Sequence, residues 1–294
     1  MLLTGASGFI GRACIAPLRA RGYDVHTISR GHTELPADVT THRGDLLDRP
    51  SIRQLVADIA PTHLLHAAWD VSHAGYWTSP RNLTWLAASI DLLEVFTSVG
   101  GTRAVGVGTC AEYEWNHIPR PGAGVAIVPV TPYGGAKLAL CHAFAAAGGL
   151  GVETAWGRIF YPYGRGDRPG RLLPLVIAAL LEQRRIDCSE CLQIRDFMHV
   201  DDVGGALAQL LDSRVNGAVD IGTGTGRPIR AIIQEIINQL GHGELVHFGA
   251  IPVRATDAPV LVANPQRLTG EVGFTPTVSL AEGVARAIAS VRDG

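Results

Sequence analysis

The chain has 294 residues, of which 47% are hydrophobic, and a formal net charge of −2. This length supports a substantial core, organised as one large α/β domain or one and a half domains. The near-neutral charge excludes the basic footprint of nucleic-acid and acidic-membrane binders, and no apolar run reaches the roughly eighteen residues of a bilayer span. We therefore predict no nucleic-acid partner, no membrane partner and no signal peptide, which indicates a cytoplasmic protein.

In the first half of the chain, short apolar strands alternate with helices. The predicted strands are Leu2–Thr4, 23–29, 62–68, Arg103–Thr109 and 152–159. The predicted helices are Phe9–Ala20, 51–59, 82–99 and Pro132–Ala147, the last with Thr131 as its N-cap. This alternation predicts an α/β fold with a doubly wound parallel sheet of the Rossmann type.

The second half changes character. Residues 162–170 are rich in Gly, Pro and Arg and indicate a loop. Further predicted helices are 173–183, 204–211, Ile229–Leu240 and one within 273–292, and residues 217–222 predict a strand. We place a soft boundary near Gly157. Residues 1–157 form the dinucleotide-binding Rossmann domain, and residues 158–294 form mainly a smaller C-terminal substrate-binding cap with segments that return to the sheet.

The cysteines and histidines give no metal pattern. Cys188 and Cys191 form a CxxC, which occurs as a zinc half-site or as a redox pair. No further ligands at matching spacing lie nearby, and none of the 11 histidines belongs to an HExxH pattern. We interpret the five cysteines as reduced and predict no metal.

The chain opens with MLLTGASGFIGRA, in which Gly5, Gly8 and Gly11 follow a short apolar stub. A glycine turn between a strand and a helix points backbone N–H groups at an anion over the helix N-terminus. Gly5 permits the tight turn, Gly8 admits a pyrophosphate, and Gly11 lets the helix pack close to the sheet. A purely structural turn would have the same pattern. The expected cofactor contacts here are Gly5, Ser7, Gly8, Phe9, Ile10 and Gly11.

The end of the second predicted strand indicates which dinucleotide binds. It reads Ile28-Ser29-Arg30 and contains no acid. A carboxylate there would repel a 2′-phosphate, whereas a hydroxyl and a guanidinium bind it well. We therefore predict a preference for NADP(H), with NAD(H) as the alternative; an exposed Arg30 without a role would look the same. Asp45 and Leu46 are candidates for the adenine edge.

Tyr133 and Lys137 are four residues apart on a predicted helix, so their side chains lie on one face. A lysine ammonium beside a phenol lowers the tyrosine pKa below its usual value of about 10. We expect this effect to make Tyr133 a proton donor or acceptor. A surface Tyr–Lys pair would have the same spacing, but the glycine turn and the strand that ends at Thr109 favour a catalytic site.

Seven stretches together resemble a known family. They are TGASGFIG at 4–11, HAA at 66–68, Asn82, GTCAEY at 108–113, YxxxK at 133–137, GRIFYPYG at 157–164 and RDFMHVDDV at 195–203. The chain resembles the extended short-chain dehydrogenase/reductases, in the branch that acts on nucleotide-diphosphate sugars. The resemblance covers nearly the whole length of the chain. The seven stretches together are specific to this branch, whereas no single one of them would be.

The resemblance implies a role for several residues. Thr109 would hydrogen-bond the sugar oxygen together with Tyr133, Lys137 would hold the nicotinamide ribose, and Arg195 would contact the diphosphate of a nucleotide-diphosphate sugar. The further cofactor assignments are His66, Ala67 and Ala68, and the further substrate assignments are Cys110 and Tyr161. One departure is that Tyr161 stands where the family often has Asn.

Apart from the resemblance, the loop of residues 69–80 follows a strand at the carboxyl edge of the sheet, where ligands bind, so His73, Tyr76 and Trp77 are candidates to line a sugar pocket. Arg171 in the basic loop is a candidate for the diphosphate; loop packing under a lid and a solvated basic loop are the structural alternatives.

The residues after Thr109 separate the reactions of this family. Dehydratases resemble one another in placing an acidic pair, or at least a Glu, there, whereas Cys110 and Ala111 cannot serve as that acid and base. Glu112 comes one residue too late, and on a strand a one-residue offset points to the opposite face. Epimerases with a second acid–base Cys place it at the position of Ala111. These departures exclude the dehydratase interpretation.

A reductase and an NAD-dependent nucleotide-sugar 4-epimerase remain, because both need only Thr109, Tyr133 and Lys137. Ser29 and Arg30 favour NADPH, and so favour the reduction of a nucleotide-diphosphate-linked 4-keto-6-deoxy sugar at C4. A 3-keto substrate would fit the same residues. A non-catalytic dinucleotide sensor is a second alternative, against which the intact catalytic set argues.

The predicted helices 82–99 and Pro132–Ala147 are apolar around much of their circumference, and such faces need covering. In the family that the chain resembles, these helices commonly pair into a four-helix interface. The resemblance therefore implies a homodimer.

Overall fold

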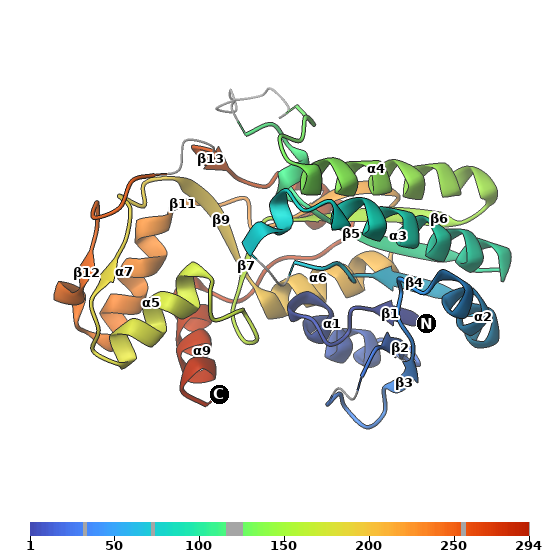
Figure 1. The fold of residues 1–294 in the computed structure, drawn as a ribbon, viewed down its shortest axis with the longest axis horizontal. Coiled ribbons are helices and arrows are strands. Elements are labelled where there is room, and N and C mark those ends of the chain that lie inside the picture. The colour runs from blue at the N-terminus through green and yellow to red at the C-terminus, as the bar shows by residue number, and fades with distance from the viewer. Residues whose placement is uncertain (32–33, 72–73, 116–125, 254–256, 294) are drawn as a thin grey trace.

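The computed structural model describes residues 1–31, 34–71, 74–115, 126–253 and 257–293. Within these residues, seven parallel strands form the main sheet in the order β10-β6-β5-β4-β1-β2-β3 (Figure 1). The strands are β1 (Leu2–Thr4), β2 (His26–Ser29), β3 (Thr40–Arg43), β4 (His63–His66), β5 (Arg103–Thr109), β6 (Glu153–Ile159) and β10 (Gly217–Ile221). The order runs outward from β1 in both directions, which confirms the predicted doubly wound Rossmann fold.

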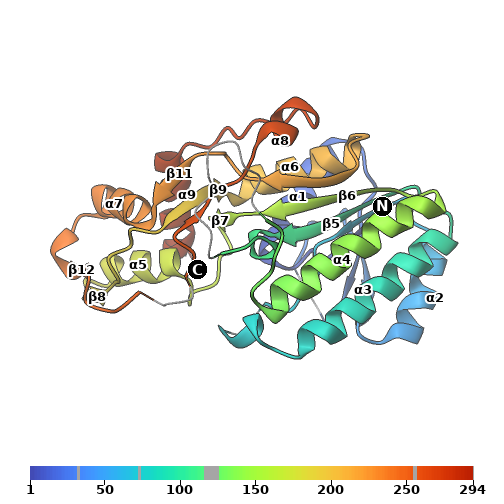
Figure 2. The same ribbon diagram turned by 90° about the horizontal axis from the view of Figure 1, so that it is seen from above.

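Helices cover both faces of this sheet (Figure 2). On one face lie α1 (Phe9–Ala20) and α6 (Val200–Asp212), and on the other lie α2 (Arg49–Ile59), α3 (Arg81–Ser98) and α4 (Pro132–Ala147). Neighbouring strand residues alternate between the two cores: Leu3 and Leu65 join the α1–α6 side, whereas Leu2 and Leu64 join the α3–α4 side. Burial on both faces explains why these strands are continuous apolar runs.

The smaller part at the left of Figure 1 is built mainly from elements that follow β6. Helices α5 (Leu172–Leu181), α7 (Ile229–Leu240) and α9 (Leu280–Asp293) share an apolar cluster that includes Ile177, Ile233 and Ile288. The short strands are β7 (Tyr161–Tyr163), β8 (Ile186–Asp187), β9 (Ile194–His199), β11 (Gly226–Pro228), β12 (Val246–His247) and β13 (Val260–Leu261). Of the short helices, η4 (Gly243–Leu245) packs with α7 in the smaller part. The others lie against α4 or β10 of the larger part: η1 (Ala74–Trp77), η2 (Cys110–Glu112), η3 (Gly148–Leu150) and α8 (Gln266–Gly270).

Several elements differ from the sequence predictions. Strand β3 was not predicted because it is the edge strand and its Thr-Thr-His-Arg sequence is largely exposed, which leaves no apolar pattern to detect. Strand β7 covers residues 162 and 163, which were predicted to belong to the loop, and α6 begins at Val200 rather than at residue 204. Strand β6 continues to Ile159, past the boundary placed at Gly157, and β10 from the second half pairs with it.

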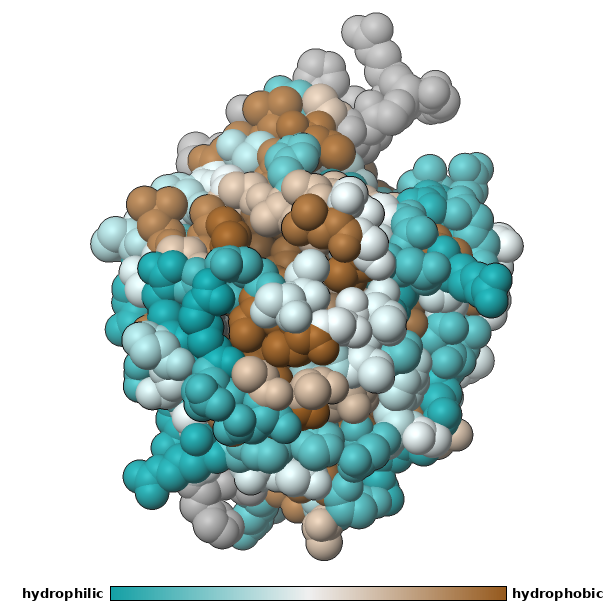
Figure 3. Space-filling view, turned by 90° about the vertical axis from the view of Figure 1, so that its right-hand side faces the viewer, coloured by the Kyte–Doolittle hydropathy of each residue, from teal (hydrophilic) through white to brown (hydrophobic). Residues whose placement is uncertain are grey.

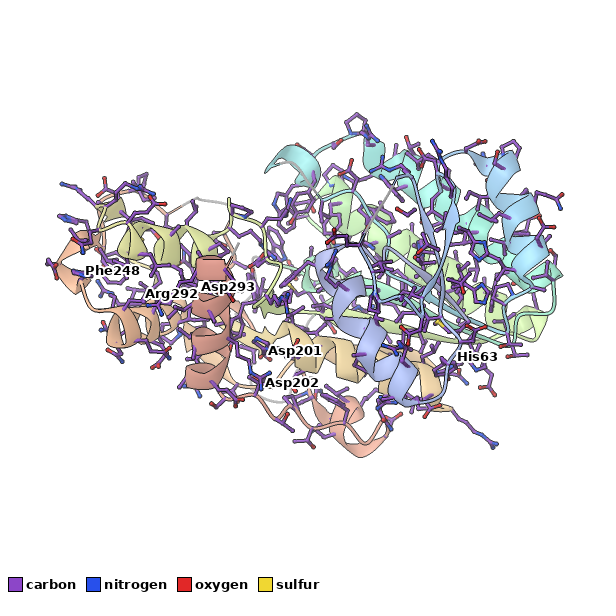
Figure 4. All side chains as sticks on the ribbon, turned by 90° about the horizontal axis from the view of Figure 1, so that it is seen from below. His63, Asp201, Asp202, Phe248, Arg292 and Asp293 are labelled. Atoms are coloured by element: carbon purple, nitrogen blue, oxygen red, sulfur yellow. The ribbon has the colours of Figure 1, made fainter. Side chains whose placement is uncertain are left out.

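The end of the molecule that faces away from the smaller part carries the amino ends of the parallel strands. Figure 3 shows this end as a mixed surface on which apolar groups lie among hydrophilic ones, and Figure 4 places His63, the first residue of β4, there. In the described parts of the chain, no helix has the length and apolarity needed to cross a membrane. Among the same residues, no group of three or more His, Cys, Asp or Glu side chains is arranged to hold a metal ion.

Two buried carboxylates tie the smaller part to the sheet. Asp196 on β9 is fully buried and accepts hydrogen bonds from the backbone N–H groups of Thr223 (3.0 Å), Gly224 (2.8 Å) and Ala263 (3.2 Å). These residues follow β10 and β13, so one side chain holds both loops. Asp202, near the start of α6 (Figure 4), accepts from the N–H of Thr277 at 3.0 Å and so holds the segment before α9.

We predict that Asp196→Ala lowers the free energy of unfolding by about 4 kcal/mol, because several buried donors lose their acceptor and each costs about 1–3 kcal/mol. Urea denaturation measures this change. The matched control is Asp58→Ala, which removes an exposed carboxylate that accepts from Gln54 and is expected to change stability by less than about 0.5 kcal/mol. Equal losses in the two variants would contradict the role of Asp196.

Candidate active site

A cavity of about 750 Å³ lies at the carboxyl edge of the sheet. Its walls come from the glycine turn after β1, from the ends of β2, β4 and β5, and from β7 and the loop before α5. Open parallel sheets bind their ligands at this edge. The cavity therefore lies where the topology places a ligand site, between the sheet and the smaller part of the molecule.

The glycine turn is built by close approach of backbone atoms. Gly5 has a φ of +73°, and its carbonyl accepts a hydrogen bond of 2.9 Å from the N–H of Gly8. A Cβ on Gly11 would lie 2.1 Å from the Gly5 oxygen, and a Cβ on Gly5 would lie 2.7 Å from the Ala68 nitrogen. Only glycine fits either position, so the N-terminus of α1 faces the cavity through a cradle of backbone that suits a dinucleotide pyrophosphate.

Most residues predicted for the cofactor line this cavity. They are Gly5, Ser7, Gly8, Phe9, Ile10, Gly11, Ser29, Arg30, Asp45, Leu46, Ala67, Ala68 and Lys137. Arg30 directly follows β2, is exposed and lines the cavity.

His66 is placed differently from the prediction, because it is the buried last residue of β4 and does not line the cavity. Its Nδ1 is 2.8 Å from the Thr4 hydroxyl, and its Nε2 is 2.9 Å from the Ser89 hydroxyl on α3. Burial, followed by the charge of Lys137, lowers the pKa of His66 to about 3, so the ring is neutral. His66 therefore links β1, β4 and α3 beneath the site, and the neighbouring Ala67 and Ala68 reach the cavity instead.

The three residues predicted as catalytic come together. Thr109 ends β5, Tyr133 is the second residue of α4, and Lys137 follows one turn later; all three line the cavity. Thr131 caps α4 by accepting from the N–H of Gly134 at 3.1 Å. A Cβ on Gly134 would lie 2.2 Å from the Ala111 oxygen, so this glycine lets the start of α4 press against the turn that follows Thr109.

The expected lowering of the Tyr133 pKa is wrong for this structure. Burial, and then the neighbouring Tyr76, raise the pKa of Tyr133, and a hydrogen bond with Thr109 acts in the opposite direction. The Lys137 ammonium donates to the Val107 carbonyl at 2.9 Å and lies 4.1 Å from the centre of the Trp69 ring. Lys137 is thus held by a backbone oxygen and an aromatic face, and desolvation of the phenol dominates at Tyr133.

Aromatic rings surround Tyr133, and we call Trp69, Tyr76 and Trp77 the aromatic cluster. Their ring centroids lie 6.4, 5.0 and 5.5 Å from that of Tyr133, each in an edge-on arrangement. Asn82 orders the cluster, because it accepts from Trp69 Nε1 at 2.9 Å and donates to the Tyr76 carbonyl at 2.7 Å. Of this cluster, sequence analysis assigned Tyr76 and Trp77 to the sugar pocket and missed Trp69. The dense aromatic spacing after β4 was the available signal for Trp69.

The residues predicted for the substrate divide into three groups. Cys110, Tyr161, Arg171 and Trp77 line the cavity, and His73 lies outside the described residues. Arg195 is only 1% exposed and does not line the cavity. It donates to Asp257 at 2.5 Å, and its guanidinium lies 5.1 Å from the centre of the Tyr161 ring. The structure therefore places Arg195 behind Tyr161, and the cations on this wall are Arg168 and Arg171.

Glu112 needs a second correction. Sequence analysis placed it on a strand, but residues Cys110–Glu112 form the one-turn helix η2. The side chain is fully buried, does not line the cavity and pairs with Arg158 at 2.7 Å. It is therefore unavailable as an acid at the cavity, for a reason that depends on the turn and not on strand alternation.

Comparison with known proteins identifies the family. Residues 1–222 match the NAD dependent epimerase/dehydratase family. The chain belongs to this family. This result confirms the resemblance to nucleotide-sugar enzymes of the extended short-chain dehydrogenase/reductase type.

Individual members of the NAD dependent epimerase/dehydratase family resemble the whole chain or part of it. A UDP-glucose 4-epimerase of Rhizobium meliloti (strain 1021) is 26% identical over 96% of this chain and 93% of its own length. The CDP-abequose synthase of Salmonella muenchen is 28% identical over 44% of this chain and 45% of its own length. The solved UDP-glucose 4-epimerase of Thermotoga maritima with UDP-glucose superposes with a TM-score of 0.90 at 21% identity, covering 99% of this chain and 98% of that one. That structure has the same fold.

We predict an unusual titration for Lys137, which is the only lysine in the chain. Burial lowers its pKa from about 10.5 to about 7. Below pH 7 the folded and unfolded chains both hold the proton, so folding bears the full cost of a buried charge. Between about pH 7 and pH 10.5 only the unfolded chain holds it, so the free energy of unfolding rises with pH.

Two measurements check this expectation. In protein labelled with ¹³C-lysine, the single side-chain signal should titrate near pH 7. Lys137→Met should be more stable than the wild type at pH 6, and this gain should shrink as the pH rises towards 10. A lysine signal that titrates at its usual pKa of about 10.4, with a stability difference that does not vary with pH, would contradict the prediction.

Proposed function

We propose that the chain reduces a nucleotide-diphosphate-linked 4-keto-6-deoxy sugar at C4, with NADPH as hydride donor and Tyr133 as proton donor. The observation that carries this proposal is that Thr109, Tyr133 and Lys137 share one cavity with the glycine turn of residues 5–11. The dinucleotide supplies the hydride when it is bound. Thr109 and Tyr133 orient the sugar oxygen, and Lys137 binds beside them at the nicotinamide ribose.

The protonation state of Tyr133 supports a reduction. Burial raises the pKa of its phenol, so the proton stays on the oxygen near neutral pH. A ketone reduction needs a proton donor at the sugar oxygen, whereas a reaction that begins by oxidising an alcohol needs a base there. The phenol therefore carries the proton that a ketone reduction transfers to the sugar oxygen.

The residues around Thr109 support a reaction with a single proton transfer. Burial raises the pKa of the Cys110 thiol to about 12, so it holds its proton at neutral pH. Ala111 has no proton to transfer, and Glu112 is engaged by Arg158 outside the cavity. A dehydration would need an acid and a base at these positions, so we do not propose one.

Cations at two ends of the cavity suit the charges of the proposed ligands. Arg30 lies at the end of β2, where a 2′-phosphate of NADP would bind, and residues 28–31 contain no carboxylate. Arg168 and Arg171 lie on the wall before α5, where they suit the diphosphate of a nucleotide sugar. The aromatic cluster offers apolar faces to the sugar ring.

An NAD-dependent nucleotide-sugar 4-epimerase is the second candidate. It is favoured by the similarity to the 4-epimerases of Rhizobium meliloti and Thermotoga maritima. It would use the same three residues and return the hydride to the other face of the sugar. A non-catalytic dinucleotide sensor is less well supported, because it has no need for Thr109, Tyr133 and Lys137 together.

The test is to mix the purified chain with NADPH, or separately with NADH, and a panel of nucleotide-linked 4-keto-6-deoxyhexoses. We expect stoichiometric loss of the reduced-nicotinamide absorbance, faster with NADPH. Bound NAD in the purified protein, with interconversion of sugar epimers and no net oxidation of added cofactor, would establish the 4-epimerase instead.

We predict that Tyr133→Phe lowers turnover at least about 100-fold while cofactor affinity stays within about threefold, because only the transferable proton is removed. Steady-state kinetics and a fluorescence titration with NADPH measure the two effects. A variant with undiminished turnover would remove Tyr133 from the reaction. If the chain is a sensor, wild type and variant would both lack turnover and bind cofactor equally.

We predict that Arg30→Ala weakens NADPH binding about tenfold or more and leaves NADH binding nearly unchanged, because a hydrogen bond to a charged group contributes about 1.5–3 kcal/mol. Calorimetric titration gives both dissociation constants. Arg12→Ala is the matched control, since Arg12 is exposed on α1 but does not line the cavity. Equal losses for NADPH and NADH in Arg30→Ala would contradict a 2′-phosphate contact.

We also propose a cytoplasmic homodimer. Helices α3 and α4 lie side by side on one face of the sheet (Figure 2), and α3 exposes Leu83 and Ile90 one heptad apart. An apolar stripe of this kind suits pairing with the same helices of a second copy.

A further inference from the structure

Glu112 is a buried carboxylate placed directly behind the catalytic Thr109. Glu112 Oε1 accepts from the backbone N–H of Thr109 at 2.9 Å and from Trp156 Nε1 at 2.9 Å. Its Oε2 accepts from Arg158 Nε at 2.7 Å. The side chain is fully buried, so all of its partners come from the protein. An unpaired carboxylate at this depth would be costly. Arg158 and the N–H groups of Thr109 and Trp156 compensate the buried Glu112 carboxylate.

The strands beside Glu112 are shaped to admit it. In the β5–β6 register, Gly106 lies opposite Trp156 and Gly108 lies opposite Arg158. A Cβ on Gly106 would lie 2.2 Å from the Trp156 ring, and a Cβ on Gly108 would lie 2.1 Å from Trp156 Nε1 and 2.6 Å from Glu112 Oε1. These glycines leave room on the surface of β5 for the indole and the carboxylate. The Glu112 site is therefore more than an ion pair with Arg158. It also depends on Trp156 of β6 and on two glycines of β5.

The hydrogen bond from Thr109 determines how that residue meets the cavity. Thr109 is the last residue of β5 and has an extended backbone. Its N–H is held by Glu112, and its hydroxyl accepts from the N–H of Ala111 at 3.2 Å. Thr109 as N-cap and Glu112 at N3 form a capping box around η2, to which the bond between Glu112 and the Thr109 N–H belongs. Loss of the carboxylate would leave the backbone N–H of Thr109 without this acceptor and loosen the backbone where β5 ends.

Arg158 connects this pair to the rest of the sheet. Its guanidinium lies 5.2 Å from the centre of the Tyr113 ring, and the Tyr113 hydroxyl donates to Asp220 on β10 at 2.7 Å. Asp220 also accepts from the N–H of Asn264 at 3.0 Å. A continuous set of contacts therefore runs from Thr109 through three strands to the loop before α8.

We propose that Glu112, held by Arg158, is a positioning residue that fixes Thr109 for contact with the sugar oxygen; this inference rests on the proposed function. Glu112 does not line the cavity and so does not touch a substrate there. It acts through the backbone of Thr109.

The test compares two double variants that remove the same charges. Glu112→Gln/Arg158→Met keeps a side-chain oxygen that can accept from the Thr109 N–H, whereas Glu112→Val/Arg158→Met removes it. Because both lack the ion pair, a difference between them reports the hydrogen bonds that the side-chain oxygen accepts from Thr109 and Trp156, and a readout at the Thr109 amide isolates the first of these bonds. Asp202→Asn is the control, since it alters another buried carboxylate that accepts a backbone N–H and that does not line the cavity.

The first measurement is hydrogen exchange at the Thr109 amide, which requires no substrate. We expect this amide in the wild type to exchange at least about 100-fold more slowly than an unprotected amide, and to exchange about tenfold or more faster in the Val variant than in the Gln variant. Asp202→Asn should leave it unchanged. An unprotected Thr109 amide in the wild type overturns the proposal even if the Val variant does not fold, and so do equal rates in the two double variants.

The second measurement is turnover of the nucleotide sugar. We expect the kcat of the Val variant to be about tenfold or more below that of the Gln variant, with the KM for the cofactor equal within about twofold, because Thr109 acts on the sugar. Equal kcat values overturn the positioning role. If the wild type turns over no nucleotide sugar, the proposed function fails, and amide exchange then decides by itself whether Glu112 holds Thr109.

Discussion

All strands of the main sheet run parallel, so the polar residues that end them meet at a single edge. The glycine turn after β1, Arg30 after β2 and Thr109 at the end of β5 are far apart in the sequence, yet they line one cavity for this reason. The apolar interior of each strand is buried on both faces, which leaves only the strand ends for polar chemistry. The smaller part closes this edge with β7 and the loop before α5.

The site places several ionisable groups away from water. Burial lowers the pKa of Lys137 and raises that of Tyr133, and both shifts express the cost of a charge in a low-dielectric setting. His66 stays neutral between two hydroxyl groups, whereas Glu112 stays in contact with Arg158 and two N–H donors. Lys137, His66 and Glu112 thus each have a hydrogen-bond partner from a different element. These buried polar contacts order the cavity walls. Burying their polar groups lowers the stability of the fold, and the two apolar cores offset this loss.

The family shares its fold among several reactions, so chemistry depends on a few side chains at the strand ends. Here the turn after Thr109 carries Cys110, Ala111 and a carboxylate that faces inward. The same turn in a dehydratase would need groups that transfer protons towards the sugar. The direction of one side chain, Glu112, is therefore as important as its identity. An acidic residue that follows Thr109 closely in the sequence therefore does not by itself indicate an acid in the site.

The alternation of strands and helices, the glycine turn and the Tyr133–Lys137 spacing were all readable from the sequence, because each depends on contacts within one or two turns of chain. Strand β3 was not, since an exposed edge strand has no apolar period. The orientation of Lys137 towards Val107 and Trp69, the burial of Arg195 behind Tyr161 and the pairing of Glu112 with Arg158 required the tertiary structure. Those contacts join residues from separate strands and helices, and whether a charged side chain faces the cavity or the core depends on how these elements pack together.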